Sequence, residues 1–190
     1  MRKLIALVLC MLGFGLASNA QLPGGNLYVG YSYFNLNTTF SPDDHRNFNG
    51  WDGAVEVNIL PFISGVADVS GTYGTVREFL ACPGAPSSCT SASPDASLHT
   101  FLFGPRLGFS VGKVRPFAEA MAGIGHASLS RASGVPSTSD TSLATAVGGG
   151  LDYKLMPILG WRFEGDYVHT SLFNTKQSNF RITTGLVLRF

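Results

Sequence analysis

The sequence predicts an all-β chain that folds as an eight-stranded antiparallel up-and-down transmembrane β-barrel. Three observations lead to this prediction: many segments alternate with a period of two residues, only 13% of the residues are charged, and polar connections alternate between long and short. Soluble proteins carry about 25% charged residues, so this chain has little surface suited to water. Its net charge of +1, without a basic block, also argues against nucleic-acid binding.

Residues 1–20 are predicted to be a secretion signal that is cleaved from a barrel domain of residues 21–190. Arg2 and Lys3 precede an apolar stretch over 4–17, and the last three residues of the segment form a small-x-small cleavage site. About fourteen apolar residues are too few for a membrane-spanning helix, which needs about 20. We therefore expect the chain to be exported.

Eight segments downstream are rich in Val, Phe, Tyr, Trp and Gly and alternate with a period of two, which is typical of strands. Each has at least about the ten residues that a tilted membrane-spanning strand requires. In chain order we expect strands near 26–36, 50–60, 63–75, 98–110, 114–127, 142–155, 159–171 and 179–190.

Within these segments the charged residues fall opposite an uncharged set. The seventh segment sets Arg162 and Glu164 against Trp161 and Phe163. A charge facing the middle of the bilayer costs about 2–4 kcal/mol for Arg or Lys, so we expect the charged faces to line the lumen as a network of ion pairs. From the second segment to the eighth, these residues are Asp52 and Glu56; Asp68; Arg106; Arg115 and Glu119; Asp152 and Lys154; Arg162, Glu164 and Asp166; Arg181 and Arg189.

Their mid-strand positions make four of these residues the candidates for the central ion pairs: Glu56, Glu119, Arg106 and Arg162. Seven acids and six bases nearly balance, and unpaired buried charges are costly. An eight-stranded barrel is just wide enough to be filled by side chains. We therefore expect a closed, ion-paired lumen and no bulk porin activity.

The connections predict which side of the barrel faces outward. Long connections at 37–49, 76–97, 128–141 and 172–178 alternate with short ones at 61–62, 111–113 and 156–158. Outer-membrane barrels have short periplasmic turns and long extracellular loops. Aromatic residues also gather as two girdles, with Tyr33, Trp51, Tyr73, Phe101, Tyr167 and Phe180 at the loop end and Phe62, Phe109, Tyr153, Trp161 and Phe190 at the turn end.

Cys82 and Cys89 lie in a segment rich in Pro, Ser and Gly, and in an exported chain we expect them to form a disulfide. Two cysteines with no histidine between them do not make a four-ligand zinc site. We expect neither a metal there nor any cofactor.

The chain resembles the outer membrane protein A type, or outer membrane protein beta-barrel domain, family of small eight-stranded barrels. The resemblance rests on the segments 27–33 (LYVGYSY), 163–167 (FEGDY) and 185–190 (GLVLRF). It implies a monomer in the cell outer membrane, in contact with its lipid. The terminal aromatic Phe190 is similar to the insertion signal that the barrel assembly machinery recognises, which implies that machinery as a partner.

With the lumen closed, the variable chemistry lies in the exposed loops. We expect a structural surface scaffold whose loops mediate adhesion or bind an extracellular partner, and not an enzyme. A narrow channel for ions or small solutes is one alternative, and a soluble secreted barrel of the lipocalin type is another.

An enzymatic alternative is an esterase that modifies lipid A, because some small outer-membrane barrels use a His-x-Ser arrangement near the bilayer surface. This chain has His169 with Ser171 and His126 with Ser128, both at the outer ends of strands. Ser–His catalysis also needs a group that orients the imidazole. Residues 170–190 contain no acid, which weakens this reading, although Asp166 or another strand could supply one.

Overall fold

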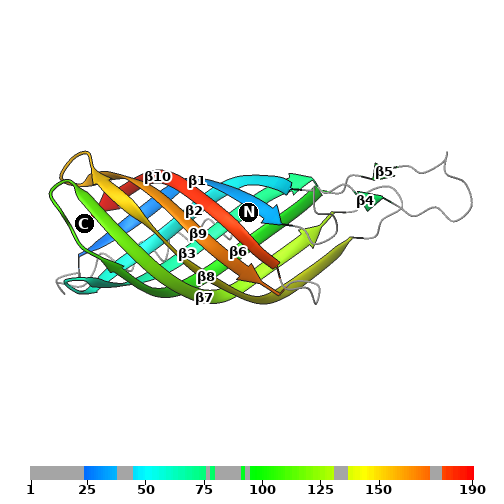
Figure 1. The fold of residues 1–190 in the computed structure, drawn as a ribbon, viewed down its shortest axis with the longest axis horizontal. Coiled ribbons are helices and arrows are strands. Elements are labelled where there is room, and N and C mark those ends of the chain that lie inside the picture. Colours follow the sequence, from blue (N-terminus) through cyan, green and yellow to red (C-terminus); the bar gives the residue numbers. More distant parts are fainter. Residues whose placement is uncertain are drawn as a thin grey trace, which may run out of the picture.

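The computed structural model is a closed barrel of antiparallel strands (Figure 1). It describes residues 24–37, 45–75, 78–79, 91–92, 95–130, 137–171 and 177–190. The predicted signal segment and the Cys82–Cys89 disulfide lie outside these residues. No helix in the described parts of the chain is long and apolar enough to cross a membrane.

Eight strands make up the barrel, as predicted. Each pairs antiparallel with its neighbours, and β1 pairs with β10 to close the sheet, in the order β1-β10-β9-β8-β7-β6-β3-β2. The barrel strands are β1 (Gly25–Asn37), β2 (His45–Leu60), β3 (Ile63–Thr75), β6 (Asp95–Gly108), β7 (Val114–Leu129), β8 (Thr138–Lys154), β9 (Leu159–Thr170) and β10 (Gln177–Arg189).

The connection between β3 and β6 contains a small sheet that the sequence did not predict. Its strands are β4 (Glu78–Phe79) and β5 (Ser91–Ala92), which pair antiparallel beyond the end of the barrel (Figure 1). Because the barrel strands run alternately up and down, the long connections leave from one end of the barrel, the loop end, and the short ones from the other, the turn end. This arrangement agrees with the predicted alternation of loops and turns.

Alternation decides which side chains face the lumen and which face outward. In β9, Trp161 and Phe163 are exposed on the outer face, whereas the neighbouring Arg162 and Glu164 are buried. The outer faces of the other strands are likewise apolar, with Val29, for example, 63% exposed. An exposed apolar surface of this kind suits contact with lipid hydrocarbon. The closed sheet suits it too, because all backbone groups of a closed barrel are hydrogen-bonded within the sheet.

The turn between β6 and β7 is short because a glycine allows it. Val111 and Val114 exchange backbone hydrogen bonds of 2.8 and 3.1 Å, and Gly112 between them has a φ of 63°. A side chain at this φ is unfavourable for most residues. Gly112 therefore lets the chain reverse within a few residues.

Candidate functional site

The lumen is the place where the sequence brings its charged side chains together. Four buried or half-buried arginines form the centre of a continuous ion-pair network in the middle of the barrel. The network reaches β2, β3, β6, β7, β8, β9 and β10, so it connects nearly the whole circumference from inside.

Arg106 on β6 is fully buried and binds three carboxylates at once. Its Nε donates to Glu119 at 2.6 Å, Nη1 to Glu56 at 3.1 Å and Nη2 to Glu164 at 3.0 Å. The guanidinium also lies 4.1 Å from the centre of the Phe117 ring. Charge-assisted hydrogen bonds of this kind are about twice as strong as neutral ones, so Arg106 fixes β2, β7 and β9 relative to β6.

Arg162 on β9 makes a bidentate salt bridge with Asp152 on β8, with Nε and Nη2 donating hydrogen bonds of 2.7 and 3.0 Å. The same guanidinium reaches Glu56 at 3.3 Å, and Arg115 donates to Glu56 from the turn side at 2.5 Å. The four residues predicted for the central pairs lie together in the structure: Glu56, Glu119, Arg106 and Arg162.

Arg181 on β10 forms a second centre nearer the loop end. It contacts Asp68 at 2.9 Å, Asp166 at 2.7 Å and Asp52 at 3.1 Å. All of these side chains are buried. Glu164 stands between the two centres, since its other carboxylate oxygen lies 3.9 Å from Arg181.

The network is less balanced than the sequence suggested. Lys154 is exposed at the turn end of β8, and Arg189 is half-buried at the end of β10. Neither makes an ion pair with another described residue. Seven buried carboxylates therefore face four guanidiniums, a formal charge of −3; the acids are Asp52, Glu56, Asp68, Glu119, Asp152, Glu164 and Asp166.

Apolar side chains gather at the loop end of the lumen, beside buried polar ones such as Thr72, the register partner of Leu98, a feature that sequence reasoning missed. Phe34 on β1 is paired in register with Phe48 on β2, and both are 2% exposed. Leu98 and Val168 are buried in the same hydrophobic cluster. Phe34 falls on the inward face of the first predicted strand, but Phe48 lies in the predicted connection 37–49, and only the early start of β2 at His45 makes it a lumen residue. We call Phe34, Phe48, Leu98 and Val168 the apolar plug.

At the turn end the lumen opens into a small cavity of about 420 Å³. Its lining is mixed: the polar residues are Asn26, Asn58, Ser110, Arg115 and Arg189, and the apolar ones are Ile59, Leu60 and Pro61. The inside of the barrel therefore changes along its axis from this vestibule through the ion-pair network to the apolar plug.

The histidines considered for catalysis lie on the outer face at the loop end. His169 Nδ1 is 3.0 Å from Ser178 Oγ on β10, and His126 Nδ1 is 2.7 Å from Thr141 Oγ1 on β8. Within the described residues, neither imidazole hydrogen-bonds to Ser171 or Ser128, and neither is bound to a carboxylate. The two His-x-Ser triplets therefore do not form a triad in this part of the chain.

The aromatic residues predicted at the membrane interfaces lie on the outer face, at two levels. Tyr33 is half-buried and the others are exposed. Trp51 and Tyr31 are register partners near the loop end, and Tyr153 and Trp161 are partners near the turn end. Amphipathic rings at both interfaces are typical of membrane barrels.

Comparison with known proteins agrees with this architecture. The sequence model of the outer membrane protein beta-barrel domain matches residues 6–190. Neisserial surface protein A has a similar structure, with a TM-score of 0.67 at 15% identity over 87% of this chain and 97% of that chain. Ail, the attachment invasion locus protein of Yersinia pestis, gives 0.57 at 16% identity over 87% and 98%.

The outer membrane protein OprG from Pseudomonas aeruginosa gives a TM-score of 0.64 at 9% identity over 88% of this chain and 96% of its own. At such identities the similarity shows the fold alone. No curated protein sequence matches the chain.

Proposed function

Because the chain belongs to the outer membrane protein beta-barrel domain family and is a barrel of the outer membrane, we propose that it is a monomeric surface scaffold whose extracellular loops bind an external partner in adhesion. The barrel supports this role by holding the ends of four loops in fixed positions. Binding residues are commonly carried on loops that a rigid scaffold positions.

The observation that carries the proposal is the closed lumen. Arg106, Arg162 and Arg181 are at most 1% exposed, and each is held by two or more carboxylates from other strands. The apolar plug lies between this network and the loop end. A barrel filled in this way favours a structural role over transport, which makes the narrow-channel alternative the weaker candidate.

The loop end is the part of the molecule suited to a partner. The turn end has only short connections, whereas the loop end carries four long ones and the additional β4–β5 sheet. Ail, which shares the fold, has been observed with the heparin analogue sucrose octasulfate. This supports adhesion as the class of function without naming a ligand for this chain.

The enzymatic alternative lacks geometric support. A Ser–His hydrolase needs a third group that orients the imidazole, and among the described residues His126 and His169 hydrogen-bond to the hydroxyl groups of Thr141 and Ser178 and not to a carboxylate. We therefore propose that the chain is not an esterase.

The proposal is tested by display of the barrel on bacteria that lack comparable adhesins. Variants in which residues 76–97 or 128–141 are each replaced by a two-residue turn are compared with the wild-type barrel. We expect every variant to insert and at least one to reduce attachment of the cells to host-cell or matrix-coated surfaces to the level of the empty vector.

A conductance measurement in planar bilayers separates the scaffold from the channel. We expect no stepwise current from the purified wild-type barrel. Two results together would show that the barrel is a channel and not an adhesin. The first is a stepwise current that is lost when Phe48 is replaced by Trp, and the second is attachment of wild-type cells at the level of the empty vector.

A further inference from the structure

We propose that the lumen holds a hard divalent cation, for which Ca²⁺ is the best fit, between the carboxylates of Glu119, Glu164 and Asp166. This site is distinct from the loops and does not depend on the proposed adhesion function. It is carried by the convergence of the three side chains, by carboxylate oxygens that no donor occupies, and by the excess of negative charge in the lumen.

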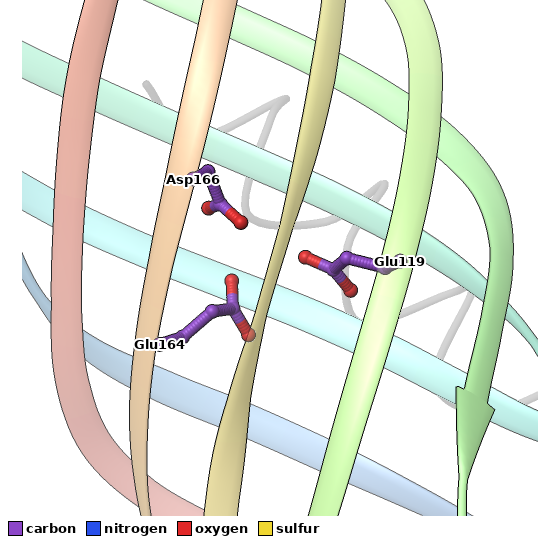
Figure 2. A group of neighbouring side chains, drawn as sticks. All are labelled: Glu119, Glu164 and Asp166. Carbon is purple, nitrogen blue, oxygen red and sulfur yellow. The ribbon is translucent and has the colours of Figure 1, made fainter.

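The three carboxylates come from two strands that are not neighbours. Glu119 projects from β7 and Glu164 and Asp166 project from β9, and all three point toward a common space on the lumen side of β8 (Figure 2). One oxygen from each lies within 4.8 Å of the oxygens of the other two. The intervening β8 has Gly148 in register with both Glu119 and Asp166, so no side chain from that position fills the space.

Ca²⁺ suits this cluster better than Mg²⁺, because its coordination geometry is flexible. Three oxygens no more than 4.8 Å apart share a point that lies within about 2.8 Å of each. Ca²⁺ binds oxygen at about 2.3–2.6 Å in flexible geometry, whereas Mg²⁺ requires about 2.0–2.1 Å in a near-ideal octahedron. A small inward rotation of the side chains would bring one oxygen of each to the Ca²⁺ distance, and water would supply the rest of the about six to eight oxygens that Ca²⁺ takes.

Two oxygens of the cluster have no hydrogen-bond donor. Arg106 holds Glu119 through Oε2, and Arg181 holds Asp166 through Oδ2. The second oxygens, Glu119 Oε1 and Asp166 Oδ1, are buried and have no hydrogen-bond partner. Both side chains are more than nine-tenths buried. A buried carboxylate oxygen without a donor is unfavourable, and a cation at the centre of the cluster would satisfy both.

The charge of the whole network also favours a bound cation. Seven buried carboxylates face four guanidiniums, and a divalent cation compensates two of the three excess negative charges. The metal ligands would all be carboxylate oxygens, and no histidine or cysteine belongs to this cluster. Oxygen-only sets of this kind select hard cations over Zn²⁺ or Cu²⁺.

The experiment measures the metal directly. The full barrel is refolded into detergent with CaCl₂, desalted into metal-free buffer, and analysed by mass spectrometry of the elements, with folding verified by the mobility of unheated samples in SDS. We expect about one Ca²⁺ per folded wild-type barrel, as for a single oxygen-ligand site. Wild-type barrel that folds without retaining Ca²⁺ would overturn the proposal, because protons would then supply the missing charge.

Glu119→Gln and Asp166→Asn locate the site. Each removes a ligand charge while keeping the size of the side chain, and we expect each to lower retained Ca²⁺ at least about tenfold. Asp52→Asn is the matched control, because Asp52 is an equally buried acid of the network that lies outside the cluster. Equal loss in all three variants, or no loss in Glu119→Gln and Asp166→Asn, would place the bound metal elsewhere and refute the assignment.

Discussion

Replacement of Arg106 by Met tests whether the ion-pair network stabilises the barrel. Met fills much of the arginine volume but leaves Glu56, Glu119 and Glu164 without the donor that now lies 2.6 to 3.1 Å away. Removal of one partner from a buried ion pair costs about 3–5 kcal/mol, because the other charge stays buried and uncompensated. Arg162 also contacts Glu56 and Glu164, so the three losses will not add. We expect a decrease of about 3–5 kcal/mol in the free energy of unfolding.

Urea titration of the refolded barrel in detergent measures this change, with the fluorescence of Trp51 and Trp161 as the probe. Both tryptophans lie on the outer face and are 46% exposed, so their emission reports loss of the apolar surroundings. With a slope of about 2 kcal/mol per molar urea, the midpoint should fall by roughly 2 M.

Lys154→Met is the control for Arg106→Met. Lys154 was predicted to line the lumen but is exposed at the end of β8, so we expect its replacement to change the unfolding free energy by less than about 0.5 kcal/mol. A loss below about 1 kcal/mol for Arg106→Met, or equal losses for both variants, would refute the view that the network is integral to the folded barrel.

Three further changes test other parts of the structure by the same titration or by assembly in cells. Gly123→Ala should destabilise the barrel by more than about 2 kcal/mol, because the added methyl group would collide with the Phe101 carbonyl. Gly53→Ala should be tolerated, because a methyl group there would lie 3.6 Å from its nearest neighbouring atom. Equal effects would contradict the close approach at Gly123. Val147→Arg, at the middle of the outer face of β8, should cost about 2–4 kcal/mol, and a neutral result would place that face outside the hydrocarbon. Phe190→Ala should lower the amount of barrel assembled in cells while refolding of the purified chain in detergent stays normal, and unchanged assembly would remove Phe190 as an insertion signal.

The barrel was predictable because alternation is strict where hydrocarbon meets one face and the lumen meets the other. The prediction for β3 agrees with the structure at both ends, but β2 begins at His45 and β8 at Thr138, several residues before the predicted starts. In these extensions the outer face becomes polar, with Asn49 and Thr141 for example, so alternation of hydrophobicity disappears while the hydrogen-bonded ladder continues. The sequence therefore indicates the membrane-spanning part of a strand better than its full length.

The network was predictable only in part. Alternation identifies which charges face inward, because it depends on neighbours within one strand. It does not identify partners such as Glu56 and Arg162, or Asp68 and Arg181, which are separated by 106 and 113 residues. Such pairs meet across the lumen, and their meeting depends on the tilt and stagger of the closed barrel. For the same reason the sequence did not show that Arg189 lies too near the end of the barrel to join the network.

The seam between β1 and β10 has a consequence for how the barrel is made. Gly25 and Phe190 exchange two backbone hydrogen bonds of 3.0 Å each, so the sheet closes only when the two outermost described strands meet. Before that, both carry a row of unpaired amide and carbonyl groups, each of which costs several kcal/mol in hydrocarbon. An incompletely closed sheet is therefore unstable in the bilayer, and its open edges are prone to pair with other chains. Insertion and closure should occur as one slow step that depends on protection of these edges until the ends of the sheet are joined.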